Sequence, residues 1–123
     1  MLYPPRSGVK LTNKRLKLFM GAYMRLALRL AEKSNHPKYK MASVVVMGGR
    51  VVAHATNHHT WGKHCEIRSL KRCGDADGAT VYVARVGGKM SKPCPMCQKL
   101  LKEYNVKCAV YMDKDGQMAH MNF

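Results

Sequence analysis

His64-Cys65-Glu66 and Pro93-Cys94-Pro95-Met96-Cys97 are the two stretches that decide the fold class of this 123-residue sequence. One histidine and two cysteines can supply three zinc ligands and leave the fourth tetrahedral position to water. A glutamate two residues past the histidine is not needed as a ligand, but it can carry protons to and from that water. The two stretches therefore predict a zinc site with an open position and a general acid and base beside it.

Two alternatives to this interpretation stay open. A structural zinc site normally has four protein ligands, and the fourth could come from Cys73, Cys108, His54, His58 or His59. Cys65 is a second candidate ligand, although the His-x-Glu spacing would then lose its meaning. We favour the catalytic interpretation, because a proline precedes Cys94 and because a strand-like run separates the two stretches.

Length and composition predict one domain over residues 1–123, with a basic arm at 1–11. Hydrophobic residues make up 46% of the chain, which is enough for a core without disulfides. The five cysteines are an odd set, which is typical of a reducing compartment, and we expect Cys73 and Cys108 to be small buried hydrophobes. No apolar run has the length of a membrane span, and the first residues lack a secretory signal. We therefore expect a soluble cytoplasmic protein.

The charge balance is the second strong signal. Lysine and arginine total 22 against 7 acidic residues, so the formal net charge is +15 and the isoelectric point is about 10.0. Residues 1–40 alone contain ten basic residues and one acid, Glu32. Such a field attracts polyanions, above all nucleic acid or phosphorylated small molecules. It also opposes self-association, so a monomer is slightly favoured over an oligomer.

The periodicity of apolar residues predicts alternating helices and strands. A helix is expected from Thr12 or Asn13 to about Ser34, ending at Asn35-His36-Pro37. Its apolar face repeats at helical spacing and consists of Leu16, Phe19, Met20, Tyr23, Leu26, Ala27 and Leu30. Two β-rich runs, 42–46 and 50–55, flank Gly48-Gly49 and predict a hairpin.

The second half of the chain continues the alternation. A short helix is expected after Glu66, stopped at Gly74-Asp75, followed by a strand over 79–85. A helix is expected over 94–104, and strands over 106–112 and 117–122. Only the tight turn at 113–116 joins the last two strands, and a parallel pair would need a crossover of a dozen or more residues. These two strands should therefore be antiparallel.

With these residues in place, the chain resembles the cytidine deaminase-like superfamily, in which the order His-x-Glu then Pro-Cys-x-x-Cys carries zinc-dependent deamination of nucleobases. The resemblance implies a three-layer α/β/α fold with a mixed five-stranded sheet. It implies that His64, Cys94 and Cys97 bind Zn²⁺ and that Glu66 is catalytic. It also suggests Asn57 and Ser91 as substrate-binding residues, by their places before the histidine and before Pro93-Cys94.

The sequence departs from the family pattern at two places. Cys65 stands where the family usually has alanine. The short C-terminal turn is similar to the branch that contains free-cytidine deaminases and bacterial toxin deaminases. It differs from the branch of deoxycytidylate, tRNA adenosine and polynucleotide cytosine deaminases, although a preceding asparagine also occurs there. The resemblance therefore leaves the subfamily open.

Three candidate functions account differently for the net charge of +15. The first is conversion of cytosine to uracil in single-stranded nucleic acid, with DNA favoured. There, basic residues would follow the phosphates, and Trp61, then Tyr3 or Tyr39, would stack on bases. Within the loop 57–63, Asn57, Trp61 and Lys63 are the expected substrate contacts. The second function is deamination of free cytidine, deoxycytidine or deoxycytidylate, and the third is a non-catalytic, zinc-stabilised nucleic-acid-binding module.

Overall fold

The computed structural model describes residues 13–59 and 64–123, with side chains from Gly21 onward. Helices and strands alternate along these residues much as the sequence predicts. The helices are α1 (Asn13–Ala31), α2 (Cys65–Cys73) and α3 (Pro95–Glu103), with a short 3-10 helix, η1, at Val86–Gly88. The strands are β1 (Met41–Met47), β2 (Arg50–Thr56), β3 (Thr80–Arg85), β4 (Cys108–Met112) and β5 (Met118–Asn122).

The five strands form one mixed sheet in the order β2-β1-β3-β4-β5. Only β3 and β4 are parallel, and helix α3 lies in the crossover that joins them. The other neighbouring pairs are antiparallel, including β4 and β5, where Met112 is opposite Met118 across the tight turn. The predicted mixed sheet with an antiparallel C-terminal hairpin is therefore confirmed.

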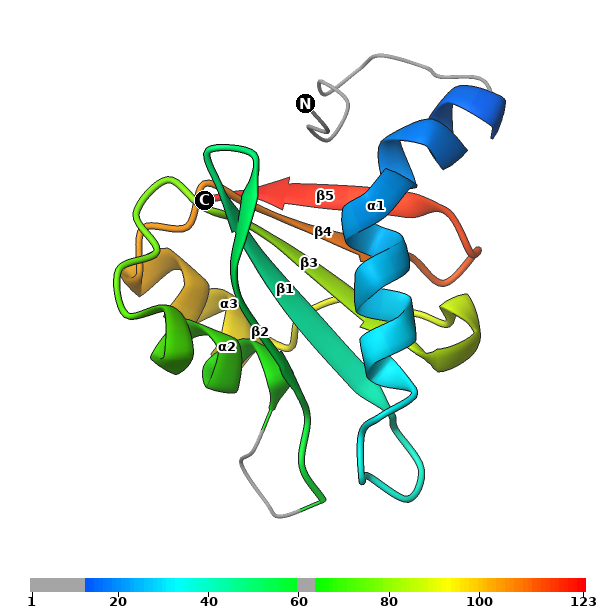
Figure 1. Ribbon diagram of the computed structural model, residues 1–123, viewed down its shortest axis with the longest axis horizontal. Helices are drawn as coiled ribbons and strands as arrows, with labels where there is room; N and C mark the ends of the chain where they lie inside the picture. Colours follow the sequence, from blue (N-terminus) through cyan, green and yellow to red (C-terminus); the bar gives the residue numbers. More distant parts are fainter. Residues whose placement is uncertain (1–12, 60–63) are drawn as a thin grey trace.

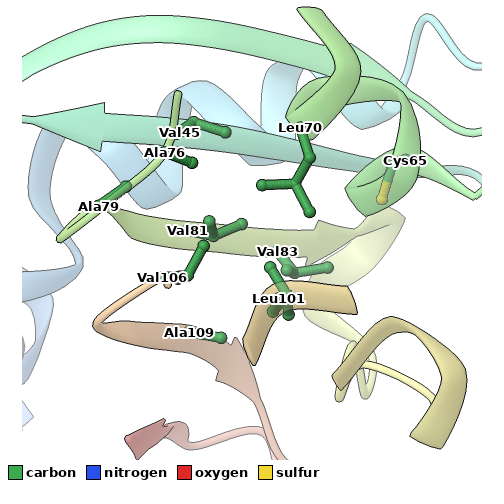
Figure 2. Close-up of a cluster of buried hydrophobic side chains, with 10 residues drawn as sticks. All are labelled: Val45, Cys65, Leu70, Ala76, Ala79, Val81, Val83, Leu101, Val106 and Ala109. Carbon is green, nitrogen blue, oxygen red and sulfur yellow. The ribbon is translucent and has the colours of Figure 1, made fainter. Parts of the chain in front are cut away.

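The sheet is covered on both faces, which gives the predicted three-layer α/β/α arrangement (Figure 1). Alternate residues of the central strands point to opposite faces, because side chains alternate along a strand. Val44, Tyr82 and Val110 pack with α1 on one face. On the other face, the core beneath α2 and α3 contains Val45, Cys65, Leu70, Ala76, Ala79, Val81, Val83, Leu101, Val106 and Ala109, as Figure 2 shows.

Helix α1 differs from the prediction of one uninterrupted helix reaching Ser34. It breaks at Gly21, where φ is 29° and ψ is −147°, a backbone conformation that residues with a Cβ rarely adopt. The helix then ends at Ala31, and the chain turns through backbone hydrogen bonds from Lys33 N to Leu30 O and from Ser34 N to Ala31 O. The side chains of the first part of the predicted apolar face, Leu16, Phe19 and Met20, lie outside the described ones.

The segments that carry the motif residues leave the sheet at one end of its strands. Strands β2, β3 and β4 run in the same direction, so their last residues Thr56, Arg85 and Met112 lie at one edge together with Met41, the first residue of β1. We call this the carboxyl edge. The connections that follow β2 and β3 lead from it to α2 and α3 (Figure 1).

Among the residues described, none of the helices is both long and apolar enough to cross a membrane.

All five cysteines are free. Cys108 is buried as predicted, whereas Cys73 is only half-buried. The division into one domain over 1–123 stays a prediction, and the basic arm at 1–11 lies outside the described residues.

Candidate metal centre

His64, Cys94 and Cys97 come together at the ends of α2 and α3 that face each other. Their ligand atoms all lie within 4.8 Å of one another. The His64 Nδ1 atom is 3.6 Å from Cys97 Sγ and 3.9 Å from Cys94 Sγ. Two segments that are thirty residues apart in the sequence therefore meet to form one donor set.

The spacing of these atoms fits a zinc ion. Zinc–sulfur distances of about 2.3 Å and zinc–nitrogen distances of about 2.0–2.1 Å, at tetrahedral angles, place a nitrogen and a sulfur ligand about 3.6 Å apart. The His64–Cys97 distance matches this value, and the His64–Cys94 distance exceeds it by a few tenths of an ångström. The residues present therefore form a chemically suitable, nearly preorganised site for Zn²⁺.

No fourth protein ligand joins this group within the part of the chain that the structure describes. The candidates for such a ligand lie elsewhere: Cys108 is buried in the core on the opposite face of the sheet, and His54 is exposed on the edge strand β2. His58, His59 and Cys73 also lie outside the group. Three ligands and an open position are typical of a catalytic zinc site.

Helices α2 and α3 each begin directly after a predicted metal ligand, and the local sequence explains why. Cys94 is the N-cap of α3 with extended backbone angles, and Pro95 occupies the first helical position, where a missing N–H costs nothing. His64 is the N-cap of α2, again extended. Neither side chain caps its own helix by a hydrogen bond, so both remain available for metal binding. The positive ends of the two helix dipoles favour thiolate ligands at this place.

Glu66 lies in the first turn of α2, one residue after Cys65, and is only 3% exposed. Burial, and next the neighbouring Glu66 carboxylate, raise the pKa of the Cys97 thiol well above its ordinary value. Glu66 follows the ligand His64 by two residues and accepts a hydrogen bond from the Cys65 thiol, so it belongs to the helical turn that begins at this ligand. A buried carboxylate in this position is suited to proton transfer at a zinc-activated water.

Cys65 does not belong to the ligand group. Its side chain is 1% exposed and is part of the core under α2, where Figure 2 shows it near Leu70. Burial, followed by the Glu66 carboxylate, raises the pKa of the Cys65 thiol, which therefore stays protonated and donates a hydrogen bond to Glu66 Oε1 at 2.9 Å. The thiol fits where the family usually has a methyl group, and it competes little for the metal.

The structure places Asn57 and Ser91, the two predicted substrate contacts that it describes, in backbone-binding roles. Asn57 is 8% exposed; its Oδ1 accepts from Met41 N at 2.9 Å and from the Ser34 hydroxyl, and its Nδ2 donates to Tyr39 O. Ser91 is 1% exposed, donates to Val83 O at 2.8 Å and accepts from Met112 N at 2.9 Å. Neither is in the ligand group, and their contact with substrate stays a prediction. Trp61 and Lys63 lie outside the described residues.

A pair of buried serines that the sequence did not predict as site residues supports the first turn of α2, which carries Glu66. The Ser43 hydroxyl on β1 donates to Cys65 O at 2.8 Å and lies 2.7 Å from the Ser69 hydroxyl. Ser69 in turn donates to Glu66 O at 3.0 Å. These contacts fix the first turn of α2 against the sheet. The available signal was a lone polar residue, Ser43, inside the apolar run of β1.

Comparison with known families places this geometry in context. The sequence profile described as the cytidine and deoxycytidylate deaminase zinc-binding region matches residues 20–113, well over half of the chain. The chain therefore belongs to this zinc-dependent deaminase family. No protein among the curated sequences compared matches the chain.

Solved structures agree with the family at the level of the fold. The cytidine deaminase from Burkholderia pseudomallei superposes with a TM-score of 0.66 at 18% identity, over 91% of this chain and 93% of that one. The dCMP deaminase from the cyanophage S-TIM5 gives a TM-score of 0.64 at 24% identity, over 86% and 89%. A structure from a study of A-to-I editing by tRNA:A34 deaminases gives 0.55 at 25% identity, over 69% of each chain.

Some matched structures are much longer than this chain. The diaminohydroxyphosphoribosylaminopyrimidine deaminase/5-amino-6-(5-phosphoribosylamino)uracil reductase from Thermotoga maritima matches with a TM-score of 0.56 at 25% identity. The match covers 69% of this chain but only 26% of that protein. The likeness is therefore limited to one part of the longer enzyme.

Proposed function

We propose that this protein is a zinc-dependent hydrolytic deaminase that converts cytosine to uracil in single-stranded nucleic acid, with DNA favoured over RNA. The observation that supports the chemistry most directly is the three-ligand group of His64, Cys94 and Cys97 with the buried Glu66 in the adjacent helical turn. A structural zinc site needs neither an open position nor a buried carboxylate next to the ligands.

The proposed reaction replaces the exocyclic amine of cytosine by oxygen from water and releases ammonia. A zinc ion held by His64, Cys94 and Cys97 would lower the pKa of water at the open position. With the metal bound, Glu66 would accept a proton from the water that attacks C4 of the base, and it would return protons to N3 of the ring and to the departing amine. Because Glu66 is almost fully buried, the proton stays within the site rather than exchanging with bulk water.

The charge distribution supports a polyanionic substrate. The net charge of +15 far exceeds what a mononucleotide, with at most two negative charges, requires. The segments that lead into the two motif stretches, 33–65 and 78–102, contain no acidic residue. A basic surface of this kind can follow the phosphates of an unpaired strand, from which a target base is more easily extruded than from a duplex.

Deamination of deoxycytidylate or free cytidine is the second candidate. It is favoured by the family profile, whose description covers both cytidine and deoxycytidylate deaminases. The similar cyanophage fold was also solved in complex with dCMP and dUMP. A preference for mononucleotides would leave most of the positive charge without a catalytic role.

Product analysis separates the candidates. Zinc-loaded protein is incubated with single-stranded DNA, single-stranded RNA, dCMP, deoxycytidine and cytidine, and the products are identified by mass spectrometry. We expect uracil in the DNA oligonucleotide, at a rate that falls steeply with salt concentration. Faster turnover of dCMP or a nucleoside would support the second candidate. The Glu66→Ala protein, which should keep zinc but lose all turnover, controls for contaminating deaminases.

A further inference from the structure

Exposed Tyr39 and Lys38 and half-buried Arg85 form a cationic and aromatic cluster, which we call the Tyr39 patch. The Tyr39 side chain is 43% exposed, although it is a large aromatic residue. The Arg85 guanidinium carbon lies 4.8 Å from the centre of its ring, and Lys38 Nζ lies 5.3 Å from it. Cations within about 6 Å of a ring centre are attracted by the electrons of the ring. The patch therefore offers a ligand positive charge and an aromatic surface at the same place.

The backbone around Tyr39 is fixed on both sides. Tyr39 N donates to His36 Nδ1 at 2.8 Å, and Tyr39 O accepts from the buried Asn57 side chain. Lys40 O then accepts from Val86 N at 3.0 Å. The ring therefore projects from a held segment rather than from a free loop, which reduces the entropy that a ligand must remove on binding.

The patch carries three side-chain groups that can form hydrogen bonds. Within the residues described, the Arg85 guanidinium, Lys38 Nζ and the Tyr39 hydroxyl make no hydrogen bond or ion pair. Arginine offers five N–H donors in a planar fork that matches a phosphate. None of the seven acidic residues of the chain lies in the segments that form the patch, 36–41 and 85–86.

The patch lies at the carboxyl edge, where the metal centre is also built. Arg85 is the last residue of β3 and pairs with Met41, two residues after Tyr39. The connection after Arg85 leads to Cys94, and Asn57, which holds Tyr39 O, precedes the segment that leads to His64. Both segments that anchor the patch therefore continue into zinc ligands.

We propose that the Tyr39 patch binds the strand beside the target cytosine, with a neighbouring base stacked on Tyr39 and a backbone phosphate bound by Arg85 and Lys38. This inference rests on the proposed function, because a mononucleotide whose only base is in the active site has no second base to stack. Stacking on an aromatic side chain is tolerant of sequence, since every base has a π-face. The patch would therefore add affinity for single strands without strict sequence preference.

Binding is measured by fluorescence anisotropy with zinc-loaded Glu66→Ala protein and a labelled DNA oligonucleotide of about 12 nucleotides that contains one cytosine. Tyr39→Leu should raise Kd about tenfold, whereas Tyr39→Phe, which keeps the ring, should stay near the parent value. Arg85→Gln should weaken binding and reduce the slope of log Kd against log salt concentration by about 0.7, the value for one contact to a single strand. Arg50→Gln, which removes the same charge at the opposite edge of the sheet, is the matched control and should change neither.

The outcomes for the patch and for the proposed function are separable. If the wild-type protein deaminates the oligonucleotide but Tyr39→Leu and Arg85→Gln bind it as Arg50→Gln does, the patch assignment is overturned and the function stands. If the oligonucleotide is never deaminated while dCMP is, the proposed nucleic-acid function fails, even where binding depends on Tyr39. A circular dichroism melting curve for each variant shows that it is folded.

Discussion

The Cys65 thiol lies 2.9 Å from Glu66 Oε1 and donates a hydrogen bond to it, in a place where both side chains are almost completely buried. One carboxylate oxygen of Glu66, the proposed general acid and base, is thereby hydrogen-bonded to the thiol. Cys65, a second candidate metal ligand in the sequence, therefore lies outside the ligand group and contacts the glutamate that we propose to be catalytic.

Substitution at Cys65 separates these two roles. Cys65→Ala should keep about one zinc per chain, because the other three residues hold the metal and a methyl group fits the same space. Cys97→Ala should lose zinc, since it removes one of three ligands. Zinc is measured by atomic emission after gel filtration, with Cys108→Ala, which lies on the other face of the sheet, as the control. If Cys65→Ala lost its zinc while Cys97→Ala and Cys108→Ala kept theirs, the assignment of the ligands would be contradicted.

Thiol labelling should report removal of the metal. In zinc-loaded protein we expect iodoacetamide to modify mainly the half-buried Cys73. A chelator should add Cys94, which is also half-buried, whereas Cys65, Cys97 and Cys108 are buried and should react slowly. Burial also raises the pKa of the Cys108 thiol, so even a basic buffer should not make it reactive. Mass spectrometry of tryptic peptides gives the modified sites, and equal labelling of Cys94 with and without chelator would contradict zinc ligation.

Ser43→Ala should lower the free energy of unfolding by about 1–3 kcal/mol, because Cys65 O and the Ser69 hydroxyl lose a partner in a buried place. Urea unfolding followed by circular dichroism measures this change. We also expect a lower kcat at a similar KM, since the first turn of α2 carries Glu66. Unchanged stability would show that water or a shifted Ser69 replaces the lost hydroxyl.

Ser91→Ala tests whether Ser91 contacts substrate or supports the loop. Its hydroxyl joins Val83 O to Met112 N, so its loss should cost about 1–2 kcal/mol of stability. If this is its only role, KM for the oligonucleotide should change little. A raised KM with an unchanged melting temperature would instead support the substrate contact that the sequence predicts.

The strands and the metal ligands were predictable because their signals are local or carry strong chemical constraints. The apolar runs of β1 and β3 identify central strands, and the tight turn before β5 leaves only an antiparallel pairing. The ligands follow from the few residue types that bind zinc and from the Cys-x-x-Cys spacing at a helix start. These features need no knowledge of distant contacts.

The remaining features depend on contacts between segments that are far apart in the sequence. The side chain of Asn57 binds the backbone at Tyr39 and Met41, and Ser91 binds the end of β4, so their roles emerge only when the strands are assembled. The break at Gly21 is equally hidden, since an isolated glycine is tolerated within many helices. Apolar periodicity continues through this position and gives no sign of the change in direction.

The most direct test of the central claim is the rate of cytosine deamination by zinc-loaded Glu66→Gln protein. The substitution keeps the size of the side chain but removes its ability to take a proton. We predict about one zinc per chain, as in the wild type, together with a fall in kcat of at least about 100-fold, the usual contribution of a general acid and base. A variant that retains both its zinc and wild-type kcat would contradict the assignment of Glu66 as the proton carrier of a catalytic zinc site.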